Sequence, residues 1–266
     1  MKRLLALALL SACTLGVRAE GAFEAEFELE DTRAVVLDLP STPVSVRACD
    51  GSVPESCPNA LLLSGHWSAV GASGAKAREN ATRPAILFDA HEGLARVSAD
   101  IPLDVEGLVD LTLNDAMMPA ALDLEVRTSL GDVDVQGIEG SVLVDTAIGD
   151  VSVRGPMRST GVRVEEGQVH VEGPGAVDVW ADDGGVRIEQ TAGAAQTHVV
   201  APGGAVELLL GDDADVDLWV RTPGRIRVQT DAFSAVSQGL YRARSGTGAT
   251  QIEIDAGGDV SVRLRE

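Results

Sequence analysis

Residues 131–153 read GDVDVQGIEGSVLVDTAIGDVSV, and this stretch decides the fold. It contains one short unit twice, at Gly131–Val135 and at Gly149–Val153: glycine, any residue, valine, any residue, valine. Five further copies, with valine, isoleucine or leucine at the apolar positions, begin at Gly167, Gly184, Gly204, Gly224 and Gly258. Successive copies are 18, 18, 17, 20, 20 and 34 residues apart. A unit that returns at a nearly constant interval predicts a stacked repeat architecture.

A second series of alternating apolar residues lies between these units. It comprises Leu122–Leu124, Val142–Val144, Val162–Val164, Val177–Val179, Thr197–Val199 and Val216–Leu218. Each coil of the stack is therefore expected to contain two short strands, whose apolar side chains point inward. A single coil cannot bury its apolar row, so the copies must fold together. We predict an all-β fold in which residues 119–266 form a β-solenoid, or β-helix-like stack of two-strand coils.

The residues between the two apolar positions of each unit are expected to form one outward row. In sequence order this row is Asp134, Ser152, His170, Arg187, Glu207, Arg227 and Ser261. Neighbours of opposite charge stabilise such a row, and Arg187, Glu207 and Arg227 alternate in sign. His170 has serine and arginine as row neighbours, which favours a solvated strand residue over a catalytic or metal-binding one.

Residues 20–118 predict an N-terminal β-rich region. Its expected strands are Phe23–Leu29, Ala34–Leu39, Val44–Val46, Leu61–Leu63, Ile86–Phe88, Ala95–Val97 and Leu108–Leu113. The longest connection between them is the polar segment Gly71–Pro84. Cys49 and Cys57 enclose a loop rich in turn residues, and a disulfide between them suits an oxidising compartment. A zinc site would need a second pair of ligands.

The first ten residues combine a cationic start with an apolar run, which is typical of an export signal. This run is too short to cross a bilayer, which takes about 20 apolar residues. Cleavage after Ala19 would make residues 1–19 the signal peptide. Alternatively, Leu10–Cys13 has the form of a lipobox, in which case residues 1–12 are removed and Cys13 carries a lipid.

Composition and charge restrict the partners of the chain. The formal net charge is −20, so the surface repels phosphate backbones and anionic lipid headgroups. We therefore expect no nucleic-acid partner, and a membrane contact only through a lipid on Cys13. Aromatic residues make up only 3% of the chain, whereas glycine occurs 29 times, which is typical of short strands joined by close turns.

The segment Leu124–Gly140, with the later Gln229–Phe233, Gln251–Ile254 and Gly258–Val262, resembles the bacterial putative-adhesin family of β-strand-repeat proteins, a domain of unknown function. The resemblance covers roughly residues 108–264 and includes the longer last interval. It implies a stack of β coils at or near the cell surface, and it brings no catalytic residues with it.

Calcium binding and carbohydrate cleavage would each leave a recognisable residue pattern in such a repeat. A calcium-binding β-roll repeats Gly-Gly-x-Gly-x-Asp every nine residues, whereas the unit here has a Gly-Asp pair in only some of its copies. Asp132 with Asp150, or the group Asp212, Asp213, Asp215 and Asp217, would bind Ca²⁺ weakly and unspecifically at most. A polysaccharide lyase or glycosidase needs paired carboxylates on a concave face, or a basic residue beside a calcium cluster. Inserted loops usually build such a cleft, whereas these coils are short and mostly free of loops. We expect no enzyme and no cofactor.

The sequence thus predicts a non-catalytic, exported protein of the bacterial envelope, located in the periplasm, anchored to the outer membrane or displayed on the cell surface. It would be an adhesin-like scaffold that presents an acidic surface to an envelope protein or a surface polymer. One alternative is a periplasmic accessory or regulator of the envelope stress response. The other is a carbohydrate-binding or carbohydrate-active β-helix protein, because Trp67, Trp180 and Trp219 could stack on sugars if they face outward.

Overall fold

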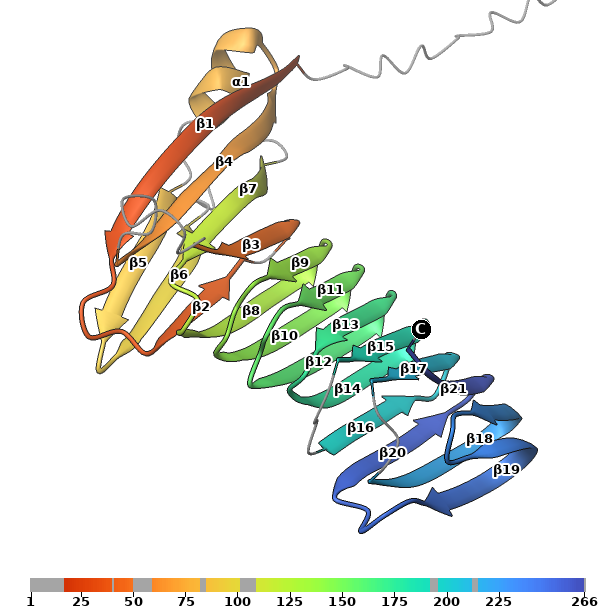
Figure 1. The fold of residues 1–266 in the computed structure, drawn as a ribbon. Coiled ribbons are helices and arrows are strands. Elements are labelled where there is room, and N and C mark those ends of the chain that lie inside the picture. Colours follow the sequence, from red (N-terminus) through yellow and green to blue (C-terminus); the bar gives the residue numbers. More distant parts are fainter. Residues whose placement is uncertain are drawn as a thin grey trace, which may run out of the picture.

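The computed structural model describes residues 17–39, 41–49, 59–81, 85–100, 109–191, 196–211 and 215–265. These residues form 21 β-strands and one short α-helix, which confirms the all-β prediction (Figure 1). No helix among them has the length and apolar character needed to cross a membrane.

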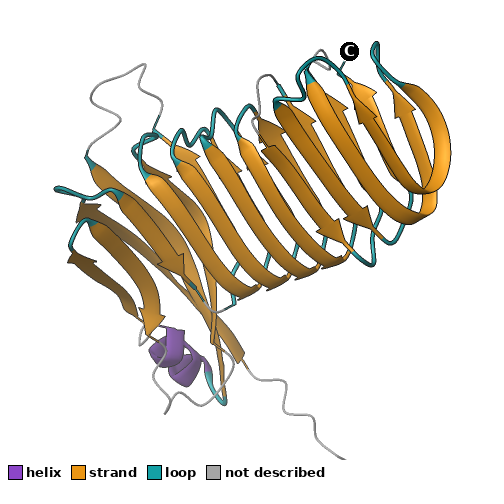
Figure 2. Cartoon of the chain, turned by 90° about the horizontal axis from the view of Figure 1, so that it is seen from below, coloured by secondary structure: helices purple, strands orange, loops and turns teal. Residues whose placement is uncertain are grey.

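Two parallel sheets run along the whole stack, and each coil contributes one strand to each sheet (Figures 1 and 2). The first sheet is called the long ladder here. Its strands, in spatial order, are β2 (Ala34–Asp38), β8 (Asp123–Leu130), β10 (Ser141–Ile148), β12 (Ser159–Glu166), β14 (Ala176–Asp183), β16 (Gln196–Ala201), β20 (Thr250–Ala256) and the first half of β18 (Val216–Gln229).

The second sheet is called the short ladder. Its strands, in spatial order, are β3 (Val44–Ala48), β9 (Val133–Gln136), β11 (Val151–Arg154), β13 (Val169–Gly173), β15 (Val186–Gln190), β17 (Val206–Leu210), β21 (Val260–Leu264) and the second half of β18. Equivalent residues pair without a register shift, for example Val133 with Val151 and Val151 with Val169. Both ladders begin before residue 119, because β2 and β3 pair in register with β8 and β9.

The apolar side chains of the two ladders face each other and form one continuous core. Val144, Val153 and Val171 are each at most 1% exposed, and every unit contributes the same kind of residue. Valine suits these positions because its β-branched side chain is stiff and packs well on a pleated surface. The alternation seen in the sequence is therefore the alternation between core and solvent.

The order of coils in space differs from the order in sequence at the C-terminal end. β18 and β19 (Ser234–Arg244) form an antiparallel hairpin at the end of the stack, and β20 and β21 then pair between this hairpin and the coil of β16 and β17. The predicted row order of Arg187, Glu207 and Arg227 is therefore wrong. Glu207 lies between Arg187 and Ser261, because the chain returns to place β21 next to β17.

Further strands extend both ladders at the N-terminal end, first with one parallel pair in each ladder and then with antiparallel pairs. β6 (Leu94–Asp100) and β5 (Ala85–His91) continue the long ladder beyond β2. β7 (Val109–Met118), β4 (Ala60–Gly71) and β1 (Val17–Glu28) continue the short ladder beyond β3. The edge strands of the two sheets meet through Phe27 and Phe88, whose rings stack with centroids 4.4 Å apart.

A short helix replaces part of the connection expected at Gly71–Pro84. α1 (Gly74–Ala81) packs on β1 and β4 and buries Ala77, Asn80 and Ala81. Asn80 donates from Nδ2 to the carbonyl of Val70 at 3.3 Å. Because the helix has only eight residues, its stability depends on this packing and not on its own propensity.

Candidate functional site

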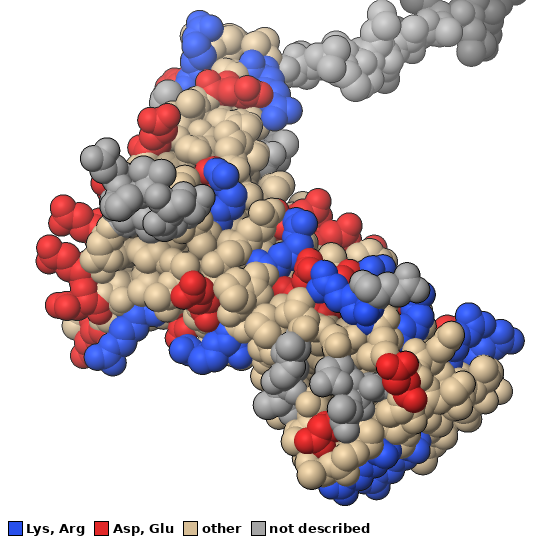
Figure 3. Space-filling model, viewed as in Figure 1, with Lys and Arg blue, Asp and Glu red and all other residues tan. Residues whose placement is uncertain are grey.

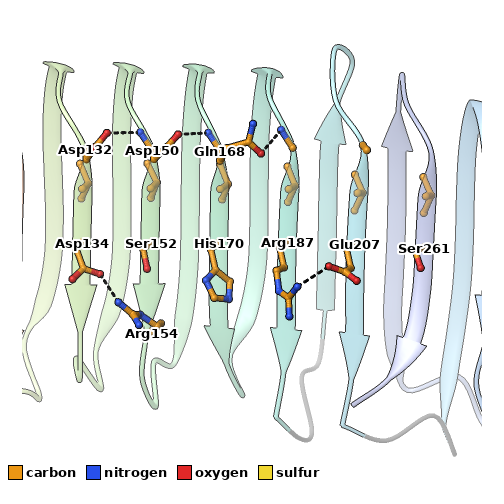
Figure 4. Close-up of a pocket in the computed structure, with 18 of the residues that line it drawn as sticks. Asp132, Asp134, Asp150, Ser152, Arg154, Gln168, His170, Arg187, Glu207 and Ser261 are labelled. Carbon is orange, nitrogen blue, oxygen red and sulfur yellow. Dashed lines mark hydrogen bonds and ion pairs between the residues drawn. The ribbon is translucent and has the colours of Figure 1, made fainter. Parts of the chain in front are cut away.

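A groove of about 960 Å³ follows the outer face of the short ladder (Figure 4). It extends from Pro43 and Ser45 at one end to Arg227 and Ser261 at the other, so it crosses the coils instead of lying within one of them. Two rows of side chains border it. The first comprises Asp132, Asp150, Gln168, Gly185, Ala205 and Asp259, and the second comprises Asp134, Ser152, His170, Arg187, Glu207 and Ser261.

Glycines at the coil corner determine how closely the rows stack. Gly149 and Gly167 have φ values of +146° and +152°, which side chains of L-residues rarely adopt. A Cβ atom at Gly167 would lie 2.1 Å from the carbonyl oxygen of Gly149, and a Cβ atom at Gly149 would lie 2.2 Å from that of Gly131. Each glycine therefore allows the next coil to sit directly on the previous one.

The residue after each glycine connects its coil to the next. Oδ1 of Asp132 accepts a hydrogen bond from the backbone N–H of Asp150 at 2.9 Å. Oδ1 of Asp150 accepts one from the N–H of Gln168 at 2.8 Å, and Oε1 of Gln168 accepts one from the N–H of Gly185 at 3.0 Å. Figure 4 shows this line of side chain to backbone bonds along the upper border of the groove. The Gly-Asp pairs of the repeat thus act as links between coils.

Asp132 and Asp150, considered above as weak Ca²⁺ ligands, each use one carboxylate oxygen in these hydrogen bonds. Among the described residues, no group of three or more His, Cys, Asp and Glu side chains is placed to hold a metal ion. Asp215 accepts hydrogen bonds from the hydroxyl of Thr247 at 2.8 Å and from the N–H of Gly248 at 2.6 Å. The Thr247 hydroxyl and the backbone N–H groups hold the pKa of Asp215 below its ordinary value. Asp212 and Asp213 lie outside the described residues.

Charges of both signs lie in the second row of the groove. Arg154 donates to Asp134 at 3.1 Å near one end, and Arg187 donates to Glu207 at 2.8 Å near the other (Figure 4). Glu207 also pairs with Arg263 of β21. Aspartates predominate around β9 and β11. Arginines line the groove at β15 and at β18, and the acidic Glu207 and Asp259 lie between these two places. A ligand in the groove would therefore meet a change of charge along its length.

His170 lies between Ser152 and Arg187 in this row, as predicted. The structure adds a neighbour that the alignment of the repeat units did not show. Nε2 of His170 is 3.4 Å from Oε1 of Glu189. Glu189 is only 13% exposed at its side chain and accepts from Arg187 at 2.9 Å. The hydrogen bond from Arg187 is the main reason why the pKa of Glu189 is lowered. His170 thus belongs to a charged surface cluster with Arg187 and Glu189.

The predicted cysteine sites are described only in part. Cys49 is buried, and its N–H donates to the carbonyl of Met118 at 2.9 Å. Cys57 and Cys13 lie outside the described residues, so the disulfide and the lipid attachment stay predictions.

The three tryptophans occupy different environments. Trp67 is buried, at 4% exposure, and packs against Phe23 in the N-terminal region. Trp219 lies under Arg221, whose guanidinium carbon is 5.4 Å from the ring centroid. Trp180 is 46% exposed on the outer face of the long ladder, where it borders a hollow of about 360 Å³.

Polar groups surround Trp180 in this hollow. Its indole N–H donates to Asp182, and Nδ1 of His198 lies 2.8 Å from Oδ1 of Asp178. Leu143, Gly161, Val162 and Arg163 complete the lining. The absent side chain of Gly161 leaves the hollow open between Leu143 and Asp178, its neighbours along the row.

No protein-family model matches this chain, and no curated protein does either. Solved structures of similar chain path include a putative cell adhesion protein from Clostridium sporogenes, with a TM-score of 0.36 and 10% identity over 93% of this chain and 100% of that chain. A putative adhesin from Bacteroides fragilis has a TM-score of 0.42 and 9% identity, covering 92% of this chain and 97% of that one. A putative adhesin from Parabacteroides distasonis has a TM-score of 0.33 and 8% identity over the same shares.

Proposed function

We propose that this chain is an exported, non-catalytic envelope protein whose β-solenoid binds an elongated ligand along the short-ladder groove. The ligand would be a surface polymer or an extended segment of an envelope protein. The observation that carries the proposal is the groove itself, which crosses successive coils from β3 to β18 and is bordered by charged and small side chains. A site of that form suits a chain-like ligand better than a compact one.

The residues in the groove support binding more than chemistry. The oxygens of Asp132, Asp150 and Gln168 accept backbone hydrogen bonds from the next coil, so they hold the groove in shape. Ser152, Gly185 and Ala205 have small side chains and keep it open. Arg187 and Glu207 would give the ligand a direction, because they favour groups of opposite charge at defined places.

A co-sedimentation assay with isolated cell-wall sacculi and with purified surface polysaccharide tests this function. We expect one of these polymers to bind the exported protein, and Ser152→Trp, which fills the groove, to abolish binding. The matched control is Asp145→Trp, an exposed outward position on β10 of the opposite face. Equal binding by both variants would show that the groove is not the site.

Export itself is tested by intact mass and by proteolysis of whole cells. The mass distinguishes a chain that begins after Ala19 from one that begins with a lipidated Cys13, and it shows whether Cys49 and Cys57 are oxidised. Cleavage of the protein by a protease added to intact cells would support surface display. Complete protection would place it in the periplasm, which suits the alternative of an envelope-stress accessory.

A carbohydrate-binding function is favoured by a separate observation, the exposed Trp180. An indole face stacks on sugar rings, and Arg163, Asp178 and His198 supply hydrogen-bonding groups around it. The bond to Asp182 holds the indole in place. We expect tryptophan fluorescence to change on titration with the binding disaccharide from a glycan array, and Trp180→Ala to remove the change. Trp219→Phe, on the same face but covered by Arg221, is the control.

A further inference from the structure

The C-terminal end of the stack finishes in a strand with one open edge. β19 pairs with β18 along its whole length, from Ser234 opposite Gln229 to Arg244 opposite Asp217. Among the residues that the structure describes, no second strand pairs with β19. Half of its backbone N–H and C=O groups therefore face away from the stack, and such an edge is a template for another strand.

The core is also incompletely covered at this end. The inward side chains of β18, such as Val220 and Ile226, are fully buried because β19 covers them. The inward side chains of β19 itself are only half-buried; they are Ala235, Ser237, Tyr241 and Ala243. Val236, at 73%, and Leu240, at 59%, are the most exposed of the large apolar side chains described.

β19 bends in the middle, and the bend restricts what can pair with it. Gly239 has a φ of +85° and lies opposite the register shift between Thr222 and Arg225 of β18. The five residues before Gly239 lie alongside the short-ladder half of β18, and the five after it lie alongside the long-ladder half (Figure 1). A straight strand could follow only one half of this edge.

We propose that the open edge of β19 pairs with β19 of a second copy of this chain, antiparallel and around a two-fold axis at Gly239. A second β19 bends at the same residue, so both halves can pair at once. A two-fold contact of this kind is self-complementary and closes after two copies. The two stacks would then be joined end to end.

The side chains of β19 fit this register. With the two-fold axis at Gly239, each residue lies opposite the residue of the second copy that is equally far from Gly239 on its other side. On the core side, Ala235 therefore meets Ala243 and Ser237 meets Tyr241 of the second copy. On the outer side Val236 meets Arg242 of the second copy. Arg242 and Arg244 thus lie opposite uncharged residues, and no two like charges are directly paired.

The opposite end of the stack is built differently. One of its two edge strands, β1, has four exposed outward glutamates, Glu20, Glu24, Glu26 and Glu28, and Glu20 lies 3.7 Å from the guanidinium of Arg18. A second β1 placed antiparallel would bring glutamates together, which is destabilising. Figure 3 shows the same contrast on the visible face: acidic side chains along the margin of the N-terminal strands, and basic ones at the lower end of the stack. The two-fold contact occupies the open edge of β19 in both copies, so it gives a dimer and not a growing filament.

Light scattering coupled to size-exclusion chromatography tests the dimer on the full exported chain. The dimer fraction should rise with protein concentration over roughly a hundredfold range, as mass action requires. Val236→Arg places two arginines opposite each other twice per dimer and should weaken dimerisation by at least roughly tenfold. Val236→Glu places a glutamate opposite Arg242 of the second copy and should strengthen it.

Both variants change one exposed position, and circular dichroism melts check that each remains folded. Val236 faces Arg227 of β18 within its own chain, so the glutamate variant keeps a favourable neighbour there even if the arginine variant does not fold. A wild-type protein that is monomeric at every concentration would overturn the proposal. A dimer that responds to neither variant, or oligomers that keep growing, would overturn it as well.

Discussion

The coils and the N-terminal strands bury their cores by different means. The coils reuse a small set of devices: glycine at the corner, pairs of inward apolar side chains and, in the coils of β9, β11 and β13, one side chain that bonds to the next coil. The N-terminal strands use a few large contacts instead, among them the stacked rings of Phe27 and Phe88 and the packing of Phe23 on Trp67. Parallel pairs form the coils, whereas antiparallel pairs join β1, β4 and β7.

This difference determines how a single substitution should act. In a stack, each coil contacts only its neighbours, so a defect at one corner disturbs two interfaces and the continuity of both ladders. In the N-terminal region, the loss of one aromatic ring removes much of a local contact but leaves the coils intact. The coils should therefore be most sensitive at glycine, and the N-terminal strands at phenylalanine.

The largest effect is expected for Gly167→Ala. Its Cβ atom would collide with the carbonyl of Gly149 at 2.1 Å, at a φ of +152°. We expect a loss of more than about 3 kcal/mol in the free energy of unfolding, or failure to fold, since strain and overpacking combine. A urea melt followed by circular dichroism measures it.

Gly239→Ala is the matched control for that prediction. Gly239 also has a positive φ, +85°, but a Cβ atom there meets nothing within 4 Å. The expected loss is about 1–2 kcal/mol, from backbone conformation alone. If both substitutions cost the same, close contact between coils is not what selects glycine at residue 167.

The second effect concerns the N-terminal strands. Phe27→Ala removes the ring that stacks on Phe88 and should cost about 2–3 kcal/mol, somewhat less than for a fully buried ring. Hydrogen exchange should show faster exchange in β1, β4 and β5, with the coils around β12 and β13 still protected. Equal loss of protection in β12 and β13 would mean that the two regions unfold as one unit.

The same comparison explains which strands could be predicted from the sequence. The strands β9, β11 and β13 follow directly from the repeat, because alternation between core and solvent is a local property of the chain. β1 and β4 extend well beyond the expected Phe23–Leu29 and Leu61–Leu63. Residues such as Gly65 and His66 lack strand character, and pairing with distant strands holds them.

The order of the strands in space could not be predicted where strands far apart in sequence pair with each other. The insertion of β20 and β21 ahead of β18 depends on contacts between residues far apart in sequence, so the row order around Glu207 was wrong. The groove forms where the two rows of outward side chains run side by side. The sequence contained one signal of the first row. Asp132, Asp150 and Gln168 occupy the same place in their units and all have a side-chain oxygen that can accept a hydrogen bond.

The third effect tests these links between coils. Asp150→Ala removes the acceptor for the N–H of Gln168 and should cost about 1 kcal/mol. Asp150→Asn keeps an acceptor oxygen at the same place and should lose less than half as much. The urea midpoints of the two variants give the comparison. An equal loss would assign the effect to the charge of Asp150 and not to its hydrogen bond.

The smallest effect concerns the charged cluster on the groove. Arg187 lowers the pKa of Glu189 below its ordinary value of 4.5, so the charged carboxylate stabilises the folded state. This contribution is complete above the ordinary pKa and is lost as the pH falls through the lower pKa of the folded protein. Glu189→Gln should therefore lower stability at pH 7 by less than about 1 kcal/mol, since Arg187 keeps Glu207 as a partner.

At a pH below both pKa values the wild type and Glu189→Gln should unfold at the same urea concentration. Glu166→Gln, at the exposed end of β12, serves as the control and should leave the midpoint unchanged at both pH values. A difference between wild type and Glu189→Gln that persists in acid would show that the side chain contributes by packing.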